Sequence, residues 1–347
     1  MTINEVIKKP GYSFLETNEH LGSNIMFLTF GGSHAYGTNV KGSDIDVRGV
    51  TCERKEELFG LSQFEQVNDN KTDTTIYGVK KFIKLCSGAN PNVIEMLGCK
   101  KDHYAHISPG GALLLDNKKL FLSQAAAYSF GGYANAQLRR LQNACARDRV
   151  ETQEQFEHVL KTTLFAIPKI AHKYDIAPDA FIVKASKAKN ENDIPMITLA
   201  PGPGFSHEAF DETSLNRINS FLRELDSIKD AYEKELTGRN RRAAQKSDKQ
   251  LNKHAMHLIR LYLMAFDILE KEEINTFRED DRDFLLSIRN GKYMDNDGKF
   301  VPEFFELVNQ YEKRLVYARE NTSLPKSVDY KKIEELMLAI YAEQLKL

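Results

Sequence analysis

The hydrophobic pattern changes once along the chain, and this change most constrains the fold. Short β-rich runs bounded by turn-forming residues dominate up to about residue 105; they include residues 24–31, 44–51 and 72–79. From Leu120 onward, apolar residues recur three and four positions apart, as on one face of an α-helix. A chain of 347 residues is long enough for two domains with buried cores. The pattern predicts an α+β fold, in which a mixed sheet with helices precedes a mainly helical domain.

The predicted domain boundary lies between residues 125 and 126. The N-terminal domain then covers residues 1–125 and the helical domain covers residues 126–347. Near residues 180–210 the helical periodicity is interrupted by β-rich fragments and by the tract that begins at Pro201, Pro-Gly-Pro-Gly. This interruption predicts a loop or a small β insertion in the helical domain.

Composition excludes several classes of protein. The 48 Lys and Arg residues nearly balance 49 Asp and Glu residues, so the chain is not a uniformly basic nucleic-acid binder, although local patches are still allowed. The four Cys residues form no C-x-x-C pair, and we expect free thiols in a reducing cytosol. The N-terminus lacks a signal-peptide core, and Arg260 and Asp267 interrupt the most apolar helical stretch. We therefore expect a cytoplasmic protein with no membrane partner.

One segment combines residues that suit phosphate and metal binding. Gly31, Gly32 and Ser33 end the first predicted strand, and after a spacer of ten residues Asp44 and Asp46 lie on the second. Alternate residues of a strand point to the same face, so the two carboxylates repel each other unless a cation lies between them. Mg²⁺ is the natural choice because it prefers oxygen ligands and often binds substrate phosphates as well. The glycines let backbone approach a phosphate, and the serine hydroxyl and nearby amides can donate to it.

These features together resemble the signature of the DNA polymerase beta-type nucleotidyltransferase superfamily. Four further segments are similar to a predicted nucleotidyltransferase family of bacteria and phages that is associated with RNA repair (RlaP-like): DTTIYGVKKFIKLCSGANPNVIEML, YANAQLRRL, KHAMHLIRLYLMAFDIL and DFLLSIRNGKY. The similarity extends from about residue 22 to residue 295. It implies an N-terminal nucleotidyltransferase domain and a helical C-terminal domain that closes a cleft. The implied enzyme transfers a nucleoside monophosphate from a nucleoside triphosphate, such as ATP, to an acceptor hydroxyl and releases pyrophosphate.

The resemblance also implies a third carboxylate from a neighbouring strand. Asp73 is the candidate, with Asp69 and Glu65 as alternatives, and its structural role would be that of a turn aspartate. The catalytic and metal-binding residues would then be Asp44, Asp46 and Asp73. They would hold two Mg²⁺ ions, with Mn²⁺ as an alternative metal.

Several other residues are candidates for binding the nucleotide. Gly32 and Ser33 would hold the β- and γ-phosphates, whereas His34 and Tyr36 either face the nucleotide or pack the turn. Arg48 either neutralises phosphate or pairs with an aspartate. On one face of a later helix, a set of basic residues either contacts phosphate or acceptor or is simply solvated: Lys253, His257 and Arg260. Glu95 lies in a short helix, either near the site or as an acid favoured by the helix dipole.

The acceptor is open to three interpretations. The first is a nucleic-acid end, most simply a tRNA-like RNA end, bound through phosphates in a basic groove that contains Arg139, Arg140, Arg239, Arg241 and Arg242. Those arginines would otherwise belong to solvated surface. The second is a protein or small-molecule hydroxyl, and the third is a catalytically silent module that binds nucleotide or RNA. No G-x-G-x-x-G or G-x-x-x-x-G-K-[ST] motif supports a dinucleotide fold or a P-loop.

Overall fold

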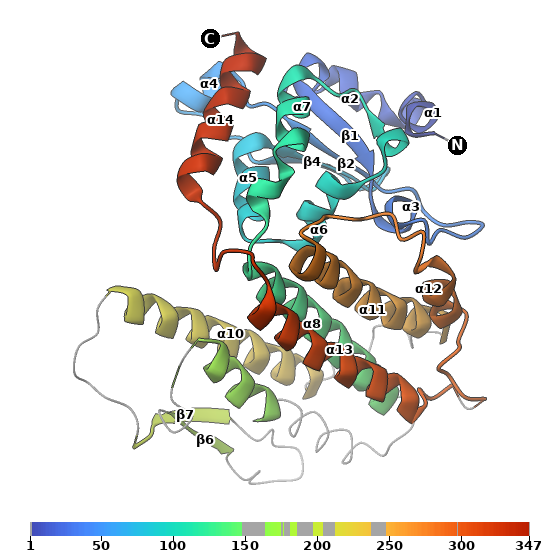
Figure 1. Ribbon diagram of the computed structural model, residues 1–347, viewed down its shortest axis with the longest axis vertical. Helices are drawn as coiled ribbons and strands as arrows, with labels where there is room; N and C mark the ends of the chain where they lie inside the picture. The colour runs from blue at the N-terminus through green and yellow to red at the C-terminus, as the bar shows by residue number, and fades with distance from the viewer. Residues whose placement is uncertain are drawn as a thin grey trace. The chain divides into compact units, whose positions relative to one another are not determined.

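A computed structural model describes residues 2–147, 164–174, 176, 181–185, 197–203, 212–236, 248–296 and 298–346. The chain divides into two compact units (Figure 1). The first, here called the sheet unit, combines Met1–Leu138 with Asp248–Leu347; the second, here called the insert unit, is Arg139–Ser247. The predicted α+β fold is confirmed, because a mixed sheet with helices is joined to a mostly helical remainder. The domain boundary predicted between residues 125 and 126 stays a prediction.

The sheet unit is built on a five-stranded mixed sheet in the order β3-β4-β2-β1-β5. Its strands are β1 (Ile25–Phe30), β2 (Val47–Thr51), β3 (Gln66–Asp69), β4 (Thr74–Gly78) and β5 (Tyr104–Ala105). The β2–β4 pair is parallel, and the β1–β2, β1–β5 and β3–β4 pairs are antiparallel. Every residue of β1 is buried, as expected for a central strand covered on both faces.

The second strand is shorter than the sequence predicts. It begins at Val47 rather than at residue 44, because β1 ends at Phe30, which is the partner of Val47. The chain then turns into a short helix at Gly32, so residues 44 and 45 have no strand to pair with. Asp44 and Asp46 therefore lie in the segment that leads into the strand. The expectation that both lie on one strand face was wrong.

Short helices precede, connect and follow the strands. They are α1 (Ile3–Ile7), η1 (Pro10–Tyr12), α2 (Phe14–Thr17), η2 (Gly22–Asn24), α3 (Gly32–Tyr36), α4 (Lys55–Phe59), α5 (Val79–Ser87), α6 (Pro91–Ile94), η3 (Glu95–Gly98), η4 (Lys101–His103), α7 (Pro109–Asp116) and η5 (Lys118–Phe121). Helix α5 covers one sheet face, where the Phe82 ring meets the Phe27 ring edge-on at 6.1 Å between centroids. Asn90 caps α6 and Pro91 is its first residue, as the sequence predicts.

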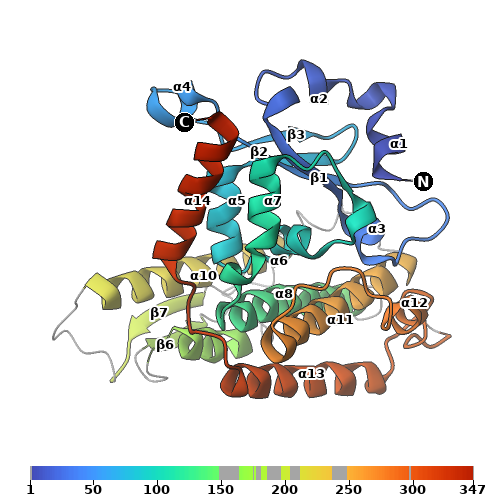
Figure 2. The same cartoon turned by 45° about the horizontal axis from the view of Figure 1, so that its top comes forward.

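The remaining helices of the sheet unit come mainly from the second half of the chain. They are α11 (Asp248–Lys271), α12 (Arg282–Arg289), α13 (Pro302–Asn321) and α14 (Tyr330–Leu345), together with the first part of α8 (Ala125–Arg147). Helix α14 returns to the sheet and packs beside α5 and α7 (Figure 2). The Tyr341 hydroxyl there donates to Glu53 Oε2 at 2.8 Å, inside the protein. The chain end thus covers the same sheet as the N-terminal strands.

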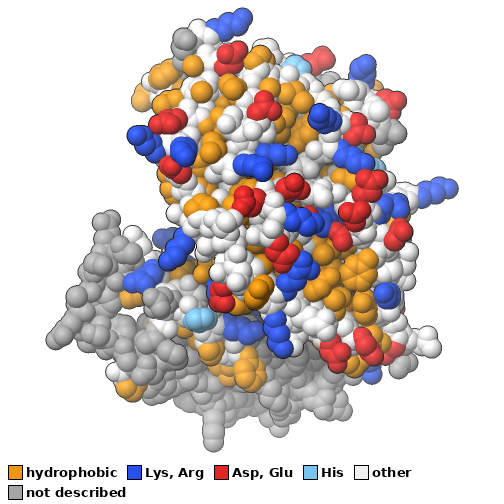
Figure 3. All heavy atoms as spheres, viewed as in Figure 1, with side chains coloured by type: hydrophobic (Ala, Val, Ile, Leu, Met, Phe, Trp, Pro, Cys, Tyr) orange, Lys and Arg blue, Asp and Glu red, His pale blue; other side chains and the backbone are white. Residues whose placement is uncertain are grey.

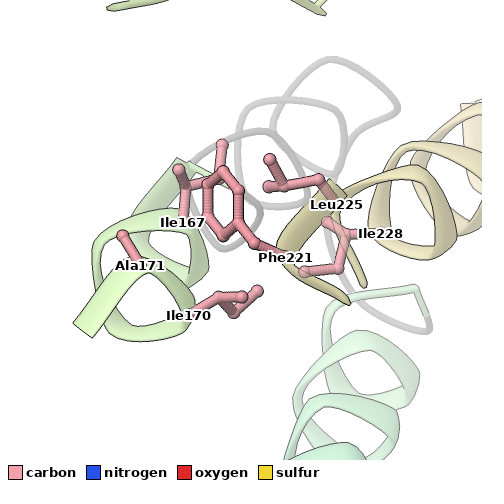
Figure 4. Packing of buried hydrophobic residues seen from close by; sticks show 6 residues of the cluster. All are labelled: Ile167, Ile170, Ala171, Phe221, Leu225 and Ile228. Carbon is pink, nitrogen blue, oxygen red and sulfur yellow. The ribbon is translucent and has the colours of Figure 1, made fainter. Parts of the chain in front are cut away.

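The described part of the insert unit contains the end of α8, a helical segment at residues 164–173, a two-stranded antiparallel sheet and a long helix. The strands are β6 (Phe181–Ala185) and β7 (Ile197–Pro201), and the helix is α10 (Glu212–Leu236). Its core is a cluster of aliphatic residues around one phenylalanine (Figure 4), formed by Ile167, Ile170, Ala171, Phe221, Leu225 and Ile228. The helical periodicity of both segments accounts for this packing.

Charged side chains of both signs are intermingled on the face of the protein in Figure 3, in keeping with the near-zero net charge. Within the described ranges, no helix is both long and apolar enough to cross a membrane. Cys52, Cys86 and Cys99 are free thiols, and the side chain of Cys145 lies outside the described residues.

Candidate active site

Two aspartates meet where a pair of neighbouring strands begins. In the parallel β2–β4 pair, Val47 is the partner of Thr74, so Asp46 and Asp73 occupy equivalent positions just before the two strands. The Val47 N–H donates to the Asp73 carbonyl at 3.3 Å, which continues the ladder to this point. The two carboxyl groups are close enough to share a hydrogen bond. The β2–β4 register therefore places Asp73 beside Asp46.

The Asp46 carboxyl is costly to ionise at this position. Burial raises the pKa of Asp46 to about 6, and the hydrogen bond and negative charge of Asp73 add to that rise. The positive charges of Arg48 and Lys253 act in the opposite direction. A cation bound between the carboxylates would favour the ionised form of both.

The glycines before α3 allow this acid to approach the turn. A Cβ on Gly32 would lie 1.8 Å from Asp46 Oδ2, and the φ angle of Gly32 is +52°, in the left-handed region. A Cβ on Gly31 would lie 2.9 Å from Arg48 Cγ and 3.2 Å from Asp46 Cβ. The Gly31 N–H also donates to the Asp46 carbonyl at 2.9 Å. The two parts of the sequence motif therefore fit against each other directly.

The alternative carboxylates for the third position have other partners. The Asp69 carboxylate accepts hydrogen bonds from the Thr72 amide and hydroxyl, at 3.0 and 2.7 Å, and so stabilises the β3–β4 turn. Glu65 lies at the opposite end of the hairpin and forms an ion pair with Lys81. Asp73 has a φ of +48° and is exposed, as a turn residue that faces solvent. Of the three acids, Asp73 is the one beside Asp46.

Arg48 pairs with both aspartates. Its Nη2 lies 3.7 Å from Asp46 Oδ1 and 3.5 Å from Asp73 Oδ1. Its Nη1 donates to the Asp73 carbonyl at 2.6 Å and to the Val47 carbonyl at 3.1 Å. The guanidinium thus supports the turn in which Asp73 lies and partly neutralises the carboxylate pair.

The donor set has the chemistry that Mg²⁺ uses when substrate completes its coordination. Mg²⁺ is commonly held by one or two carboxylates together with phosphate oxygens and water. Within the part of the chain that the structure describes, no group of three or more His, Cys, Asp or Glu side chains could hold a metal ion. Asp46 and Asp73 are two such carboxylates, so their chemistry fits an ion that substrate also holds. Asp44 is exposed, and its part in such a site stays a prediction.

The two residues that follow the glycines differ in their surroundings. Ser33 is partly exposed, and its carbonyl accepts a hydrogen bond from the Thr38 amide at 3.0 Å, which closes the α3 turn. The His34 ring lies beside Phe30, with 5.6 Å between centroids. Its Nε2 is buried and has no hydrogen-bond partner. Both residues are partly exposed, but the Nε2 atom of His34 is buried.

Tyr36 points into the interior. It is fully buried, and its hydroxyl contacts Met264 Sδ at 2.9 Å and donates a short hydrogen bond to Glu95. The Arg260 guanidinium lies over the Tyr36 ring, 3.5 Å from its centroid. Burial raises the pKa of Glu95, while the charge of Arg260 and the Tyr36 hydrogen bond lower it. This network links the motif turn to η3 and α11.

The basic residues of α11 do not share one environment. Arg260 is buried, with its Nε lacking a hydrogen-bond partner and its Nη2 in short contact with His257 Nε2. Lys253 is exposed and close enough to Asp46 to lower its pKa. The helix therefore brings one exposed cation to the carboxylate pair and one buried cation to Tyr36.

The arginines predicted to bind nucleic acid are only partly described. Arg139 is half-buried, and burial lowers its pKa while Glu224 raises it; Arg140 is exposed. The side chains of Arg239, Arg241 and Arg242 lie outside the described residues. The groove proposed for them therefore stays a prediction.

Sequence reasoning missed Tyr12, which lies in η1 ahead of the sheet. Burial raises the pKa of Tyr12, and the negative charges of Asp46, Asp69 and Asp73 raise it further. The hydroxyl therefore lies near the carboxylates. No motif marks this tyrosine, because only the packing of η1 beside the β3–β4 turn brings it there.

Sequence reasoning also missed three donors that bind successive carbonyls after α3. The Arg278 amide donates to Tyr36, Arg282 Nε to Gly37 and Arg289 Nη1 to Thr38, at 3.1, 2.8 and 2.7 Å. The orphan carbonyls at the end of the motif helix are thus satisfied from α12 and the segment before it.

Comparison with known protein families gives one match. The model of a family described as RlaP, RNA repair pathway DNA polymerase beta family, matches residues 9–197. The matched region contains the glycine turn, Asp44, Asp46 and Asp73. Searches of curated proteins and of solved structures found no match.

Proposed function

The chain belongs to the RNA repair pathway DNA polymerase beta family, and from this premise we propose that it is a Mg²⁺-dependent nucleotidyltransferase acting on an RNA end. In the proposed reaction an acceptor hydroxyl oxygen attacks the α-phosphorus of a nucleoside triphosphate. A new P–O bond forms, the bond to the leaving oxygen breaks, and pyrophosphate and the hydroxyl proton are released. The observation that carries the proposal is the carboxyl pair of Asp46 and Asp73 beside the Gly31-Gly32 turn.

Asp46 and Asp73 would hold the magnesium, with Asp44 as the further predicted ligand. Bound Mg²⁺ supplies stabilisation of the negative charge on the attacking and leaving oxygens. The raised pKa of Asp46 supports this role, since a half-buried carboxyl that is costly to ionise alone gains most from a nearby cation. The contacts of Arg48 with both carboxylates would keep Asp46 and Asp73 in place when metal and nucleotide bind.

The phosphates would be bound from two sides. Ser33 and the amides of the α3 turn offer donors next to the carboxylates, as short phosphate-binding turns do. Lys253 offers an exposed ammonium whose charge already acts on Asp46. Arg260 is buried and packs on the Tyr36 ring. Arg260 would therefore position α3 rather than contact phosphate.

The direct test is transfer of an α-labelled nucleoside monophosphate. Each labelled triphosphate would be incubated with Mg²⁺ and with RNA, DNA or protein acceptors. We expect label on RNA with the wild type, loss of label with Asp46→Asn, and normal labelling with Glu65→Gln, whose carboxylate pairs with Lys81 away from the site. Label found only on protein, or nowhere, would overturn the proposal.

The acceptor groove has its own test. If Arg139 and Arg140 contact RNA phosphates, affinity falls as salt concentration rises, because bound counterions are released on binding. RNA affinity that does not change with salt would contradict a phosphate-binding groove.

A further inference from the structure

The exposed side chain of Tyr133 is hydrogen-bonded to Asn90, the residue that caps α6. Tyr133, on the part of α8 within the sheet unit, has 37% of its surface exposed. Its hydroxyl accepts a hydrogen bond from Asn90 Nδ2 at 3.2 Å. Asn90 in turn caps α6, because its Oδ1 accepts the Asn92 amide at 3.1 Å. The tip of the tyrosine is therefore held in place while part of its ring faces solvent.

The sheet connects this ring to the carboxylate pair. In the parallel β2–β4 register, Arg48 is the partner of Thr75 and Val50 is the partner of Tyr77, so Arg48 and Tyr77 point to the same face of the sheet. Two residues along a strand span about 7 Å. Burial raises the pKa of Tyr77, the positive charge of Arg48 lowers it, and Glu95 and Tyr133 raise it further. Along this sheet face, Tyr77 lies one step further from Asp46 than Arg48 does, and Tyr133 interacts electrostatically with Tyr77.

Two small residues flank Tyr133 on the exposed surface of α8. Gly132 precedes Tyr133 and Ala136 lies one helical turn after it, and both are exposed. A Cβ on Gly132 would meet no atom within 4 Å. These two positions carry no bulky side chain that would block a flat ligand beside Tyr133.

We propose that Tyr133 is the platform on which a nucleobase stacks, with the phosphate end of that nucleotide directed towards Arg48 and the two aspartates. The inference rests on the proposed function and adds the position of the base. The Tyr133 hydroxyl is already bound by Asn90, so the ring face is the surface available for recognition. An aromatic face accepts every base, so the platform adds affinity without reading sequence.

The test measures binding and needs no turnover. The probes are 2-aminopurine riboside triphosphate with Mg²⁺ and a short single-stranded RNA that ends in 2-aminopurine, both followed by fluorescence quenching. Tyr133→Ala is expected to weaken binding of at least one probe about tenfold, and Tyr133→Phe to change it less than about twofold, since phenylalanine keeps the ring. Tyr128→Ala is the matched control. Tyr128 is an exposed tyrosine of the same helix that contacts Arg319 instead, and its loss should leave both affinities unchanged.

Tripolyphosphate, measured by calorimetry, separates base from phosphate. Its affinity should be the same for wild type and Tyr133→Ala, because it has no base. Weaker binding of the triphosphate probe alone would assign the platform to the incoming nucleotide, and weaker binding of the RNA probe alone to the acceptor; either supports the inference.

Three results would overturn the inference: a folded Tyr133→Ala variant with wild-type affinity for both probes, equal loss of tripolyphosphate binding, or no binding of either probe by the wild type. Stacking on Tyr133 without any nucleotidyl transfer would leave the platform standing while the proposed function fails.

Discussion

Gly32 and Asp46 fit together so closely that a methyl group on the glycine would lie 1.8 Å from the carboxylate Oδ2. The glycine comes from the turn before α3, and the acid comes from the segment before β2. Their contact explains why a residue without a side chain is needed at the start of α3. This requirement is separate from any need for the backbone to approach a phosphate. It also makes the shape of the turn and the position of the acid mutually dependent.

The first prediction follows from this contact. Gly32→Ala should lower the free energy of unfolding by about 1–3 kcal/mol, because it combines a left-handed backbone with a clash against Asp46. It should also abolish nucleotidyl transfer by displacing the acid. Gly88→Ala is the control, since Gly88 has a φ of −88° and a new Cβ there would lie 3.7 Å from its nearest neighbour. A Gly32→Ala variant as stable and active as the wild type would contradict the fit; urea unfolding and labelled transfer measure both.

The second prediction concerns stability against pH in metal-free protein. The folded-state pKa of Asp46, about 6, exceeds the ordinary aspartate value of 3.8. The folded protein therefore binds the Asp46 proton more tightly than the unfolded chain does. This protonation stabilises the fold fully below about pH 4, and its contribution is lost as pH rises through about 6. Wild type should lose roughly 2–3 kcal/mol over that range. Asp46→Asn should lack this loss and be the more stable protein at pH 7.5.

Urea unfolding at several pH values measures this dependence. Asp44→Asn serves as the control because Asp44 is exposed. Its curve should keep the wild-type slope between pH 4 and pH 6. If the stability of Asp46→Asn changed with pH in parallel with that of the wild type, the pKa of Asp46 would not be raised in the folded protein.

The third prediction separates the three candidate carboxylates. Asp73→Asn should lower transfer at least about 100-fold and remove any rise in melting temperature that MgCl₂ and nucleotide produce in the wild type. Asp69→Ala should instead lower stability by about 1 kcal/mol, because Thr72 loses its acceptor in the turn. Glu65→Gln should behave as wild type in both assays. Full activity of Asp73→Asn would exclude it as the third carboxylate.

The fourth prediction concerns the buried contact between Tyr36 and Glu95. Tyr36→Phe removes the phenol that donates to this carboxylate and should lower the free energy of unfolding by about 1–3 kcal/mol. Glu95→Gln should also destabilise, and the double variant should cost less than the sum of the two, since both remove one interaction. Additive costs would show that the two residues act independently. Tyr128→Phe, at an exposed position, is the control for loss of a hydroxyl.

Local features of the fold could be read from the sequence. The β-rich runs at residues 24–31 and 72–79 became β1 and β4, and Asn90-Pro91 began α6. The helical periodicity after residue 120 predicted α10 and α11. These features depend on neighbouring residues in the chain, whose spacing and side-chain types act on the local backbone directly.

Other features could not be read in this way. The return of α14 to the sheet depends on contacts such as Tyr341 with Glu53, far apart in sequence. Likewise, the burial of Tyr36 against Arg260 follows from the packing of α3 on α11, whereas the sequence left both residues equally free to face a nucleotide.

The sequence by itself determined the chemistry that the chain carries: two glycines and a serine in a turn, acids spaced for a cation, and the family that this pattern resembles. Only the tertiary structure decided which acid lies beside Asp46 and where the second strand begins. The physical reason is strand register. Pairing of Val47 with Phe30 and with Thr74 joins segments that are distant in the chain, and a local pattern contains no information about which of them will meet.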